Sequence, residues 1–181
     1  MKSSLTFKIA LASVMAALAI VLEKLSIPLG DGTYKITLYG FPLLFTSVFY
    51  GPLVGGCAGL VVGFISQLTS IYGISATSVL WMIAPVLWGT VGGLILKLFK
   101  SENKYNIFNI IIVVVITSLL VSLTNSLVMF LDGQILGYVV EQTLVNIVIR
   151  CLISLAMCVP YSIVLYFLCN RLKHLSWQKR N

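Results

Sequence analysis

Arg150 is a charged residue inside a long apolar segment, and polar residues recur at every fourth position around it. A charge at such depth in a membrane costs at least about 2.5 kcal/mol unless it is paired or hydrated. On a helix this spacing gathers the polar side chains on one face, which we expect to point into the protein. The face would recognise a carboxylate or phosphate of a ligand; the alternative is a structural arginine, bonded to helix-end carbonyls or neighbouring polar groups. The stripe consists of Gln142, Asn146, Arg150 and Ser154.

A second polar face lies on the preceding apolar segment, and it comprises Ser118, Ser122, Asn125, Ser126 and Met129. Single polar residues of this kind join helices with about 0.6 kcal/mol each. Together the two faces predict a polar cavity, with plain helix packing as the alternative. A tryptophan, Trp81, offers a ring for stacking on a planar ligand or an anchor at the membrane interface. The residues predicted to bind a ligand are Arg150, Asn146, Gln142, Gln67, Trp81, Asn125 and Tyr39, with Tyr34 and Tyr72 as further candidates to close the cavity from the outer loops.

The sequence has no pattern for catalysis or nucleotide binding. It lacks the GxxxxGK[ST] phosphate-binding loop and the HExxH zinc motif, and its only histidine, His174, lies in the basic tail. No pair of carboxylates lies in the apolar segments for acid–base chemistry. The four cysteines fall in apolar runs without CxxC spacing, as small buried residues do. We therefore predict a protein that is not an enzyme and has no metal or cofactor, so that active transport would draw its energy from a partner.

The composition predicts an integral membrane protein. Of the 181 residues, 59% are apolar and only 9% are charged, and the mean hydropathy is +1.05; soluble domains carry about 25% charged residues. At about 20 residues per crossing, the length suits one compact all-α bundle that occupies 1–181 as a single domain. We predict six transmembrane helices, the fourth bent at Pro85 and the sixth long enough to overrun the membrane or kink at Pro160. Their ranges are 9–22, 36–50, 52–71, 78–99, 106–131 and 138–172.

The basic residues are distributed unevenly between the predicted connections. With the N-terminus inside, nine lysines and arginines fall on the inner side and two, Lys24 and Lys35, on the outer side. Because lysine and arginine concentrate on the cytoplasmic side of membrane proteins, we predict that both termini are cytoplasmic. Topology thus accounts for the net charge of +7, and the bilayer rather than a nucleic acid is the expected surrounding partner.

Glycine recurs at every fourth position in another apolar segment, at Gly51, Gly55, Gly59 and Gly63. Such a ladder leaves one helix face without side chains, which allows the backbone of another helix to approach closely. We interpret this face as the central packing seam of the bundle. Only the outer end of the segment, Ser66 and Gln67, is expected to reach a ligand.

Taken together, the pattern resembles the substrate-binding S components of the energy-coupling factor (ECF) vitamin transporters of prokaryotes. The resemblance rests on ALASVMAALA in 10–19, KITLYGFPLLFTSVFYGPLVGGCAGLVVGFISQL in 35–68 and VNIVIRCLISLAMCVPYSIVLYFL in 145–168, and it spans nearly the whole chain. With Arg150 and the later Pro160, the last helix is most similar to the folate-type S components. Segment 73–79, GISATSV, departs from the folate-type pattern, so cobalamin, pantothenate and riboflavin stay open as ligands.

The resemblance implies a six-helix bundle in the prokaryotic cell membrane that binds a vitamin from outside, with folate as the first choice. It also implies docking on a transmembrane coupling subunit that works with two ATPase subunits. In that family a small-residue pair of the first helix forms the docking face, and the pair maps here onto Ala12 and Ala16. A membrane structural protein without a small ligand is the alternative from a different class.

Overall fold

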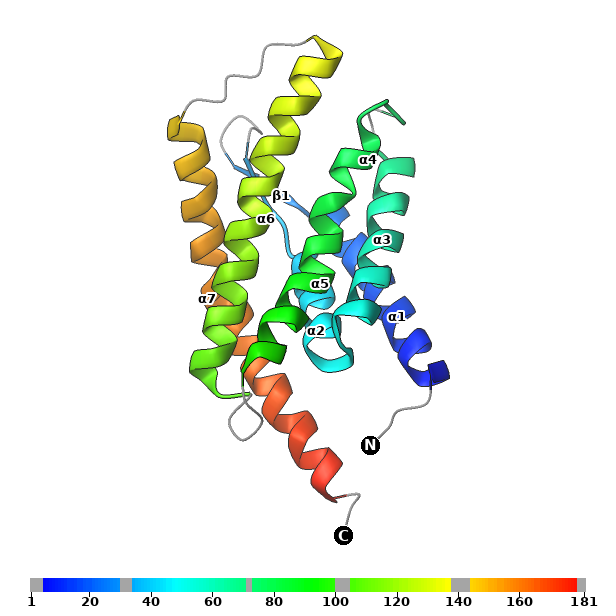
Figure 1. Ribbon diagram of the computed structural model, residues 1–181, viewed down its shortest axis with the longest axis vertical. Helices are drawn as coiled ribbons and strands as arrows, with labels where there is room; N and C mark the ends of the chain where they lie inside the picture. The colour runs from blue at the N-terminus through cyan, green and yellow to red at the C-terminus, as the bar shows by residue number, and fades with distance from the viewer. Residues whose placement is uncertain (1–4, 30–33, 71–72, 100–104, 138–143, 179–181) are drawn as a thin grey trace.

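The computed structural model describes residues 5–29, 34–70, 73–99, 105–137 and 144–178 (Figure 1). Within them the regular elements are helices apart from one short hairpin, which confirms the prediction of an all-α membrane protein. The elements are α1 (Leu5–Lys24), β1 (Ile27–Leu29), β2 (Tyr34–Ile36), α2 (Gly40–Tyr50), α3 (Pro52–Leu68), α4 (Ser78–Trp81), α5 (Ile83–Leu98), α6 (Ile107–Leu136) and α7 (Leu144–Gln178).

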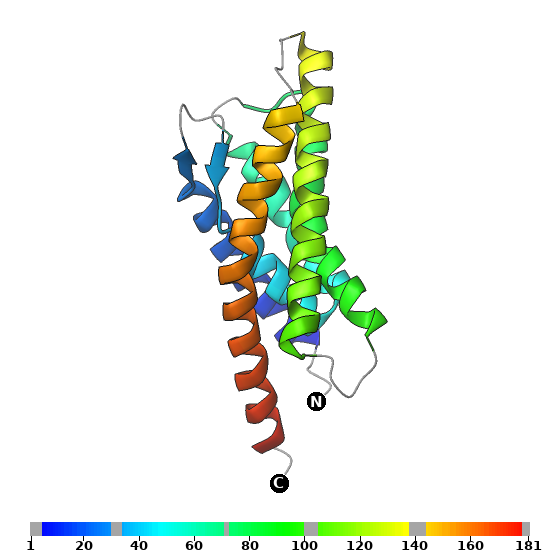
Figure 2. The same ribbon diagram turned by 90° about the vertical axis from the view of Figure 1, so that its left-hand side faces the viewer.

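The helices stand side by side in an order that the chain does not follow. Figure 1 shows α6 and α7 as a pair on one side and α1 and α3 on the other, with α2 and α5 between them. Helix α1 begins and α7 ends at the same end of the bundle, as Figures 1 and 2 show, and this agrees with an even number of crossings. We call this the terminal end. The opposite end, where α1 and α6 finish and α7 begins beside β1 and β2, is the hairpin end.

Four stretches of the described chain are long and apolar enough to cross a membrane: Thr6–Lys24, Ser78–Leu98, Ile107–Leu136 and Val145–Arg171. The last two belong to α6 and α7, with 30 and 35 residues; these rise about 45 and 52 Å, against about 30 Å of hydrocarbon. Helix α7 runs unbroken through Pro160, and its C-terminal part extends beyond the other helices (Figure 2). Helices α2 and α3, with 11 and 17 residues, are shorter.

The second predicted helix, 36–50, is wrong in its first part. Strand β2 pairs antiparallel with β1, with Lys35 opposite Pro28, and α2 begins only at Gly40. The β-branched residues Ile36 and Thr37 favour an extended chain, and a proline three residues into α2 suits the first turn of a helix. Because α2 rises only about 16 Å, the extended residues before it supply the rest of this crossing.

Helices α3 and α5 pack through glycine, as the four-residue spacing predicts. The closely approaching pairs are Gly55 with Gly89, Gly59 with Pro85 and Gly63 with Met82. At the first two, an added Cβ would collide with the carbonyl oxygen of the partner, whereas at Gly63 the nearest atoms would be 3.1 Å away. The two backbones are therefore in direct contact over about two helical turns, and α3 and α5 form the scaffold to which the other helices attach.

Gly51 departs from this assignment. Nothing lies within 4 Å of the position that a Cβ on Gly51 would occupy, so this glycine does not serve helix packing. Its φ of 97° is a conformation that glycine adopts freely and other residues rarely do. A single residue thus reverses the chain between α2 and α3, and Pro52 then starts α3 as predicted.

The fourth predicted helix is interrupted at Met82, in the turn that precedes Pro85. Pro85 has no N–H to donate to the carbonyl oxygen of Trp81, and its ring crowds that turn, so the disruption falls on the turn before the proline. Around the break the Met82 N–H donates to Val79 O at 3.3 Å, and the Val86 N–H donates to Met82 O at 3.4 Å. Helices α4 and α5 therefore form one crossing with a weakened turn.

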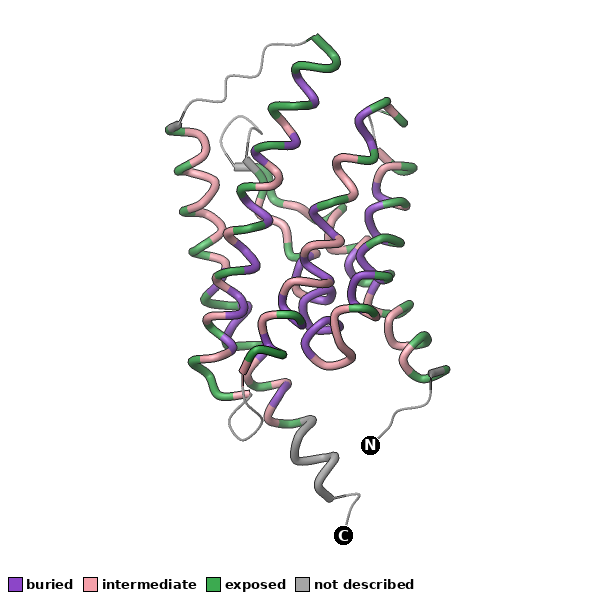
Figure 3. The backbone as a smooth tube through the Cα atoms, in the orientation of Figure 1, coloured by how far each residue is buried: buried purple, intermediate pink, exposed green. Residues whose placement is uncertain are grey.

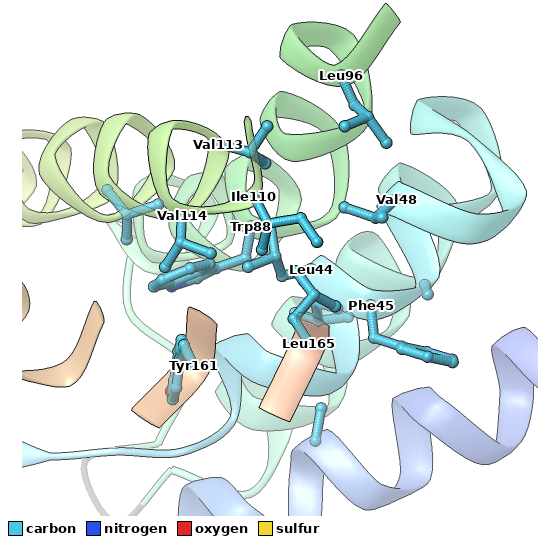
Figure 4. Packing of buried hydrophobic residues seen from close by; sticks show 14 of the residues in the cluster. Leu44, Phe45, Val48, Trp88, Leu96, Ile110, Val113, Val114, Tyr161 and Leu165 are labelled. Carbon is cyan, nitrogen blue, oxygen red and sulfur yellow. The ribbon is translucent and has the colours of Figure 1, made fainter. Parts of the chain in front are cut away.

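The buried core surrounds α2. Every residue from 42 to 48 is buried, which is typical of a helix that is covered on all sides (Figure 3). Figure 4 shows side chains from α2, α5, α6 and α7 meeting there, among them Leu44, Trp88, Val113, Tyr161 and Leu165. This packing fixes the lower half of the bundle, so the hairpin end rests on a rigid base.

Candidate functional site

The polar face predicted on α6 lies against α7, where Arg150 of the other predicted stripe and two cysteines contact it. The pairs across the interface are Ser118 with Cys158, Ser122 with Cys151 and Met129 with Arg150. The serine and cysteine pairs are contacts of a helix–helix interface, in which Ser122 Oγ and Cys151 Sγ are 3.9 Å apart. Only the third pair, near the hairpin end, brings a charged group to the interface.

Arg150 is half-buried, and its Nη2 donates to Met129 Sδ at 2.8 Å. A thioether is a weak acceptor, whereas a guanidinium presents five N–H donors in a planar fork. An oxygen acceptor of a bound molecule would therefore be a better partner than the sulfur. The contact holds the Arg150 side chain against α6, where it faces the hairpin end of the α6–α7 pair.

Asp132 lies at the same level. Helix α6 continues to Leu136, so Asp132, which the sequence placed in a loop, is a buried residue of this helix. It follows Met129 by about one turn, and Asn146 precedes Arg150 by about one turn. Because α6 and α7 are antiparallel, Asp132 and Asn146 come to one level, about one turn beyond the contact between Met129 and Arg150. The sequence missed Asp132 because it ended the helix at 131.

Tyr161 joins α7 to the extended chain that leads into α2. Its hydroxyl donates to the Thr37 carbonyl oxygen at 2.9 Å, and its ring packs edge-on against Phe41 and Trp88 with 5.8 Å between centroids in each case (Figure 4). Trp88 also shares a side-chain hydrogen bond with Tyr39. Non-helical backbone inside a membrane needs such partners because lipid offers none. These aromatic residues form the floor of the hairpin end.

Replacing Tyr161 with phenylalanine is expected to destabilise the protein while preserving the ring contacts. The change removes the donor to Thr37 O, and a buried polar group left without its partner costs about 1–3 kcal/mol. Thermal unfolding in detergent, followed by circular dichroism, measures the effect. Tyr166→Phe on the same helix is the matched control, because Tyr166 is half-buried and its ring contact with Phe167 is kept. Equal melting temperatures for the two variants would contradict the role of the Tyr161 hydroxyl.

Helices α1 and α3 are joined at the hairpin end by two polar contacts. The buried Ser66 hydroxyl donates to Glu23 Oε2, and Lys24 Nζ donates to the Thr69 carbonyl oxygen at 3.2 Å. Glu23 is also close enough to Tyr39 for an electrostatic interaction. From the sequence, Glu23 and Lys24 served only as markers of topology, because nothing local reveals a partner 43 residues away.

The other residues predicted to bind a ligand are spread around the hairpin end. Asn125, Asn146, Gln67, Trp81 and Tyr39 are all half-buried. Asn125 lies one turn before Met129 on α6; Gln67 follows Ser66 on α3; Trp81 closes α4, the short helix that contacts α6. Tyr39 is linked to Trp88 and Glu23. Gln142 and Tyr72 lie outside the described residues.

The two small residues of α1 that were expected to dock a partner, Ala12 and Ala16, face partly toward the bundle. Ala16 is only 3% exposed, and Ala12 is half-buried against the core. On the outer side of α1, Ala10, Ser13 and Ala17 are exposed. A partner that reaches α1 from the lipid would meet this second set of small residues first.

The hairpin end combines a donor group, acceptor groups and aromatic rings. Arg150 supplies N–H donors, Glu23 and Asp132 supply carboxylates, and Trp81 and Tyr39 supply rings. Within the described part of the chain, no group of three or more His, Cys, Asp or Glu side chains could hold a metal ion. This set of groups suits a polar organic molecule with a flat ring.

A family model for the S component of the ECF-type riboflavin transporter matches residues 4–174. Among solved structures, the S component of a bacterial ECF transporter superposes with a TM-score of 0.69 at 19% identity, covering 95% of this chain and 98% of that chain. ThiT from Listeria monocytogenes superposes with a TM-score of 0.62 at 18% identity, covering 96% of each chain. Curated protein sequences give no significant match. The structural likenesses confirm the fold, and the family match covers nearly the whole sequence. The chain belongs to the family of ECF-type riboflavin transporter S components.

Proposed function

We propose that this chain is the riboflavin-binding subunit of an ECF importer in a prokaryotic cell membrane. The family match over residues 4–174 carries the proposal, because the description of that family names a riboflavin transporter. S components are vitamin-binding parts of transporters and not enzymes, which favours this role over that of a membrane structural protein. Folate, the first choice from the sequence, has no support in the comparisons.

The charges at the hairpin end also favour riboflavin over folate. Riboflavin is a neutral molecule whose ring system offers carbonyl oxygens and ring nitrogens to a donor such as Arg150. Folate carries carboxylates, and Glu23 and the buried Asp132 would repel these groups of the ligand. Like charges brought together at an interface cost several kcal/mol. Arg150 would then donate hydrogen bonds to neutral acceptor atoms of the flavin ring and not to the anionic group expected from the sequence.

We place the ligand at the hairpin end, above the aromatic floor formed by Tyr161 and Trp88. The described side chains that are proposed to bind the ligand are half-buried, whereas the core around α2 is fully buried. Trp81 is proposed to stack on the ring system, and the amides are proposed to bind its polar edge. The proposed ligand-binding residues are Arg150, Asn146, Asn125, Gln67, Trp81 and Tyr39, together with Gln142.

The importer is proposed to include a transmembrane coupling subunit and two ATPase subunits, as the family relationship implies. Helix α1 is proposed as the docking face, because it is the least buried of the four long crossings of the described chain. Of the two residues first assigned to docking, Ala12 is partly accessible, and Ala16 becomes accessible only if α1 moves; Ala10, Ser13 and Ala17 are proposed to make the outer contact. Lys8 lies near the start of α1, Lys97 in the last turn of α5 and Arg171 in the C-terminal part of α7, which supports a cytoplasmic position for the terminal end.

Riboflavin binding to the purified full-length protein tests this proposal. We expect one riboflavin per chain, with quenching of flavin fluorescence on binding because aromatic side chains stack on the ring. Folate, cobalamin and pantothenate in large excess should leave the quenching unchanged. The absorbance spectrum and the mass of any co-purified compound provide a second readout.

Each outcome of this experiment bears on a different part of the proposal. Retention of folate, cobalamin or pantothenate in place of riboflavin would overturn the choice of vitamin and keep the transport role. A well-folded protein that neither retains any vitamin nor binds the four in solution would contradict the proposed function as a whole.

A further inference from the structure

Glu23 occupies a position that the helix itself disfavours. It lies in the last turn of α1, which ends at Lys24, where the carbonyl groups of the helix concentrate negative charge. An acidic side chain there is opposed by the helix dipole, and partial burial adds a further cost. A carboxylate in such a place needs favourable partners, and these lie on the inner side of α1.

The Glu23 carboxylate points toward the bundle. Its Oε2 accepts a hydrogen bond from Ser66, which is buried on α3. The same carboxylate is close enough to Tyr39, at the start of α2, for an electrostatic interaction. An ionised carboxylate can accept about four hydrogen bonds, and the Ser66 hydroxyl supplies one. Glu23 therefore keeps acceptor capacity while Ser66 holds it in a fixed orientation.

Glu23 lies beside the aromatic floor, and Arg150 lies above the floor on α7. Tyr39, the neighbour of Glu23, shares the Trp88 side chain as a partner with Tyr161 on α7. Arg150 and Tyr161 are eleven residues apart on an unbroken helix, which places them on nearly the same face, three turns or about 16 Å apart. Because Tyr161 points into the bundle at Trp88 and Thr37, Arg150 lies on the α7 face that looks into the bundle, nearer the hairpin end.

We propose that Glu23 is a specificity-determining residue that binds the hydroxyl groups of the ligand's polyol chain. This inference rests on the proposed function, in which Arg150 donates to the acceptor-rich edge of the flavin ring. The ribityl chain is the donor-rich part of riboflavin, and a carboxylate with a serine and a tyrosine beside it is the matching acceptor. Recognition of the two ends by groups of opposite charge would select a flavin with its sugar chain over the bare ring.

Glu23→Gln is the variant that tests the proposal, because the amide oxygen can still accept the hydrogen bond of Ser66 while the charge is lost. Affinities for riboflavin and for lumiflavin, which has the flavin ring but no ribityl chain, are measured by fluorescence titration of the full-length protein. We expect about tenfold weaker riboflavin binding, since hydrogen bonds to charged groups are the stronger ones, and lumiflavin binding within about twofold of wild type. Lys24→Gln, which removes the neighbouring charge, should leave both affinities within about twofold.

Two results would overturn the inference and leave the proposed function standing. One is unchanged riboflavin affinity in Glu23→Gln; the other is an equal loss for riboflavin and lumiflavin, which would mean that Glu23 only shapes the protein. If the wild type binds neither flavin, the test is repeated with the compound that co-purifies with the wild type. If this compound no longer co-purifies with Glu23→Gln, Glu23 contacts a ligand other than riboflavin that has hydroxyl donors. If the variant retains the compound as well as the wild type does, Glu23 makes no contact with the ligand. A wild type without any bound compound would overturn both proposals.

Discussion

Replacing Gly59 with leucine is expected to abolish the recovery of folded protein. Gly59 faces α5 so closely that even a Cβ would collide with the Pro85 carbonyl oxygen and lie 2.8 Å from Val86 Cα. Leucine adds three more carbons to a gap between two backbones, where no flexible side chain can move aside. Overpacking costs about 1–3 kcal/mol where side chains can adjust and more where they cannot. Yield and monodispersity in detergent size-exclusion chromatography measure the loss.

A matched control lies on the same helix. Cys57 is exposed on the lipid-facing side of α3, so Cys57→Leu adds similar bulk outside the seam and should leave the yield unchanged. Gly63→Ala should be milder than Gly59→Ala, because its Cβ would lie 3.1 Å from Met82 Cα and 3.3 Å from the Met82 carbonyl oxygen, whereas a Cβ at Gly59 would collide with the Pro85 carbonyl oxygen. If Gly59→Leu instead expressed normally and changed only the choice of ligand, the glycine face would belong to the binding site and not to the scaffold.

The scaffold was predictable because its signals are local. Long apolar runs mark the crossings, and a glycine at every fourth position marks a face on which another backbone can rest, whichever helix that proves to be. The partner itself, α5, was not predictable from α3. Its own Gly89 and Gly93 meet Gly55 and Ser47 only because the chain returns to the same place after α4. In a membrane protein, the helix faces toward lipid and toward the bundle are both apolar. The sequence therefore did not show that Ala16 faces inward and Ala17 faces outward.

The hairpin end was less predictable because its contacts are between distant residues. The bond from Ser66 to Glu23 spans 43 positions, and the bond from Tyr161 to Thr37 spans 124. Neither pair shows a periodic pattern in the sequence. Glu23 served only as a marker of topology, and Ser66 was expected to reach a ligand and not a carboxylate of α1. The Arg150 stripe was recognised because a charge in an apolar segment is costly wherever it lies. Its contact with Met129 depended on the register of α6 against α7, which local spacing does not set.

The contact between Arg150 and Met129 is compatible with two roles for Arg150, and the two roles differ in what its removal changes. As a ligand-binding residue, it would donate to an oxygen acceptor of the ligand, and its loss would act on affinity. As a structural residue, it stabilises the hairpin end of α6 and α7 through its neighbours, and its loss acts on the stability of the ligand-free protein. Melting temperature without ligand and affinity of the folded fraction therefore separate the two roles.

Replacing Arg150 with alanine is expected to weaken riboflavin binding by about 10- to 100-fold, because hydrogen bonds to charged groups contribute about 1.5–3 kcal/mol. Arg150→Lys keeps the charge but loses the planar fork, so it should recover only part of the affinity. Lys35→Ala removes an exposed cation from the same end of the bundle and should leave affinity within about twofold. Fluorescence titration of the folded fraction measures all three variants. Wild-type affinity in Arg150→Ala, combined with a lower melting temperature, would show that Arg150 is a structural residue, because the loss of a direct hydrogen bond to the ligand must weaken binding.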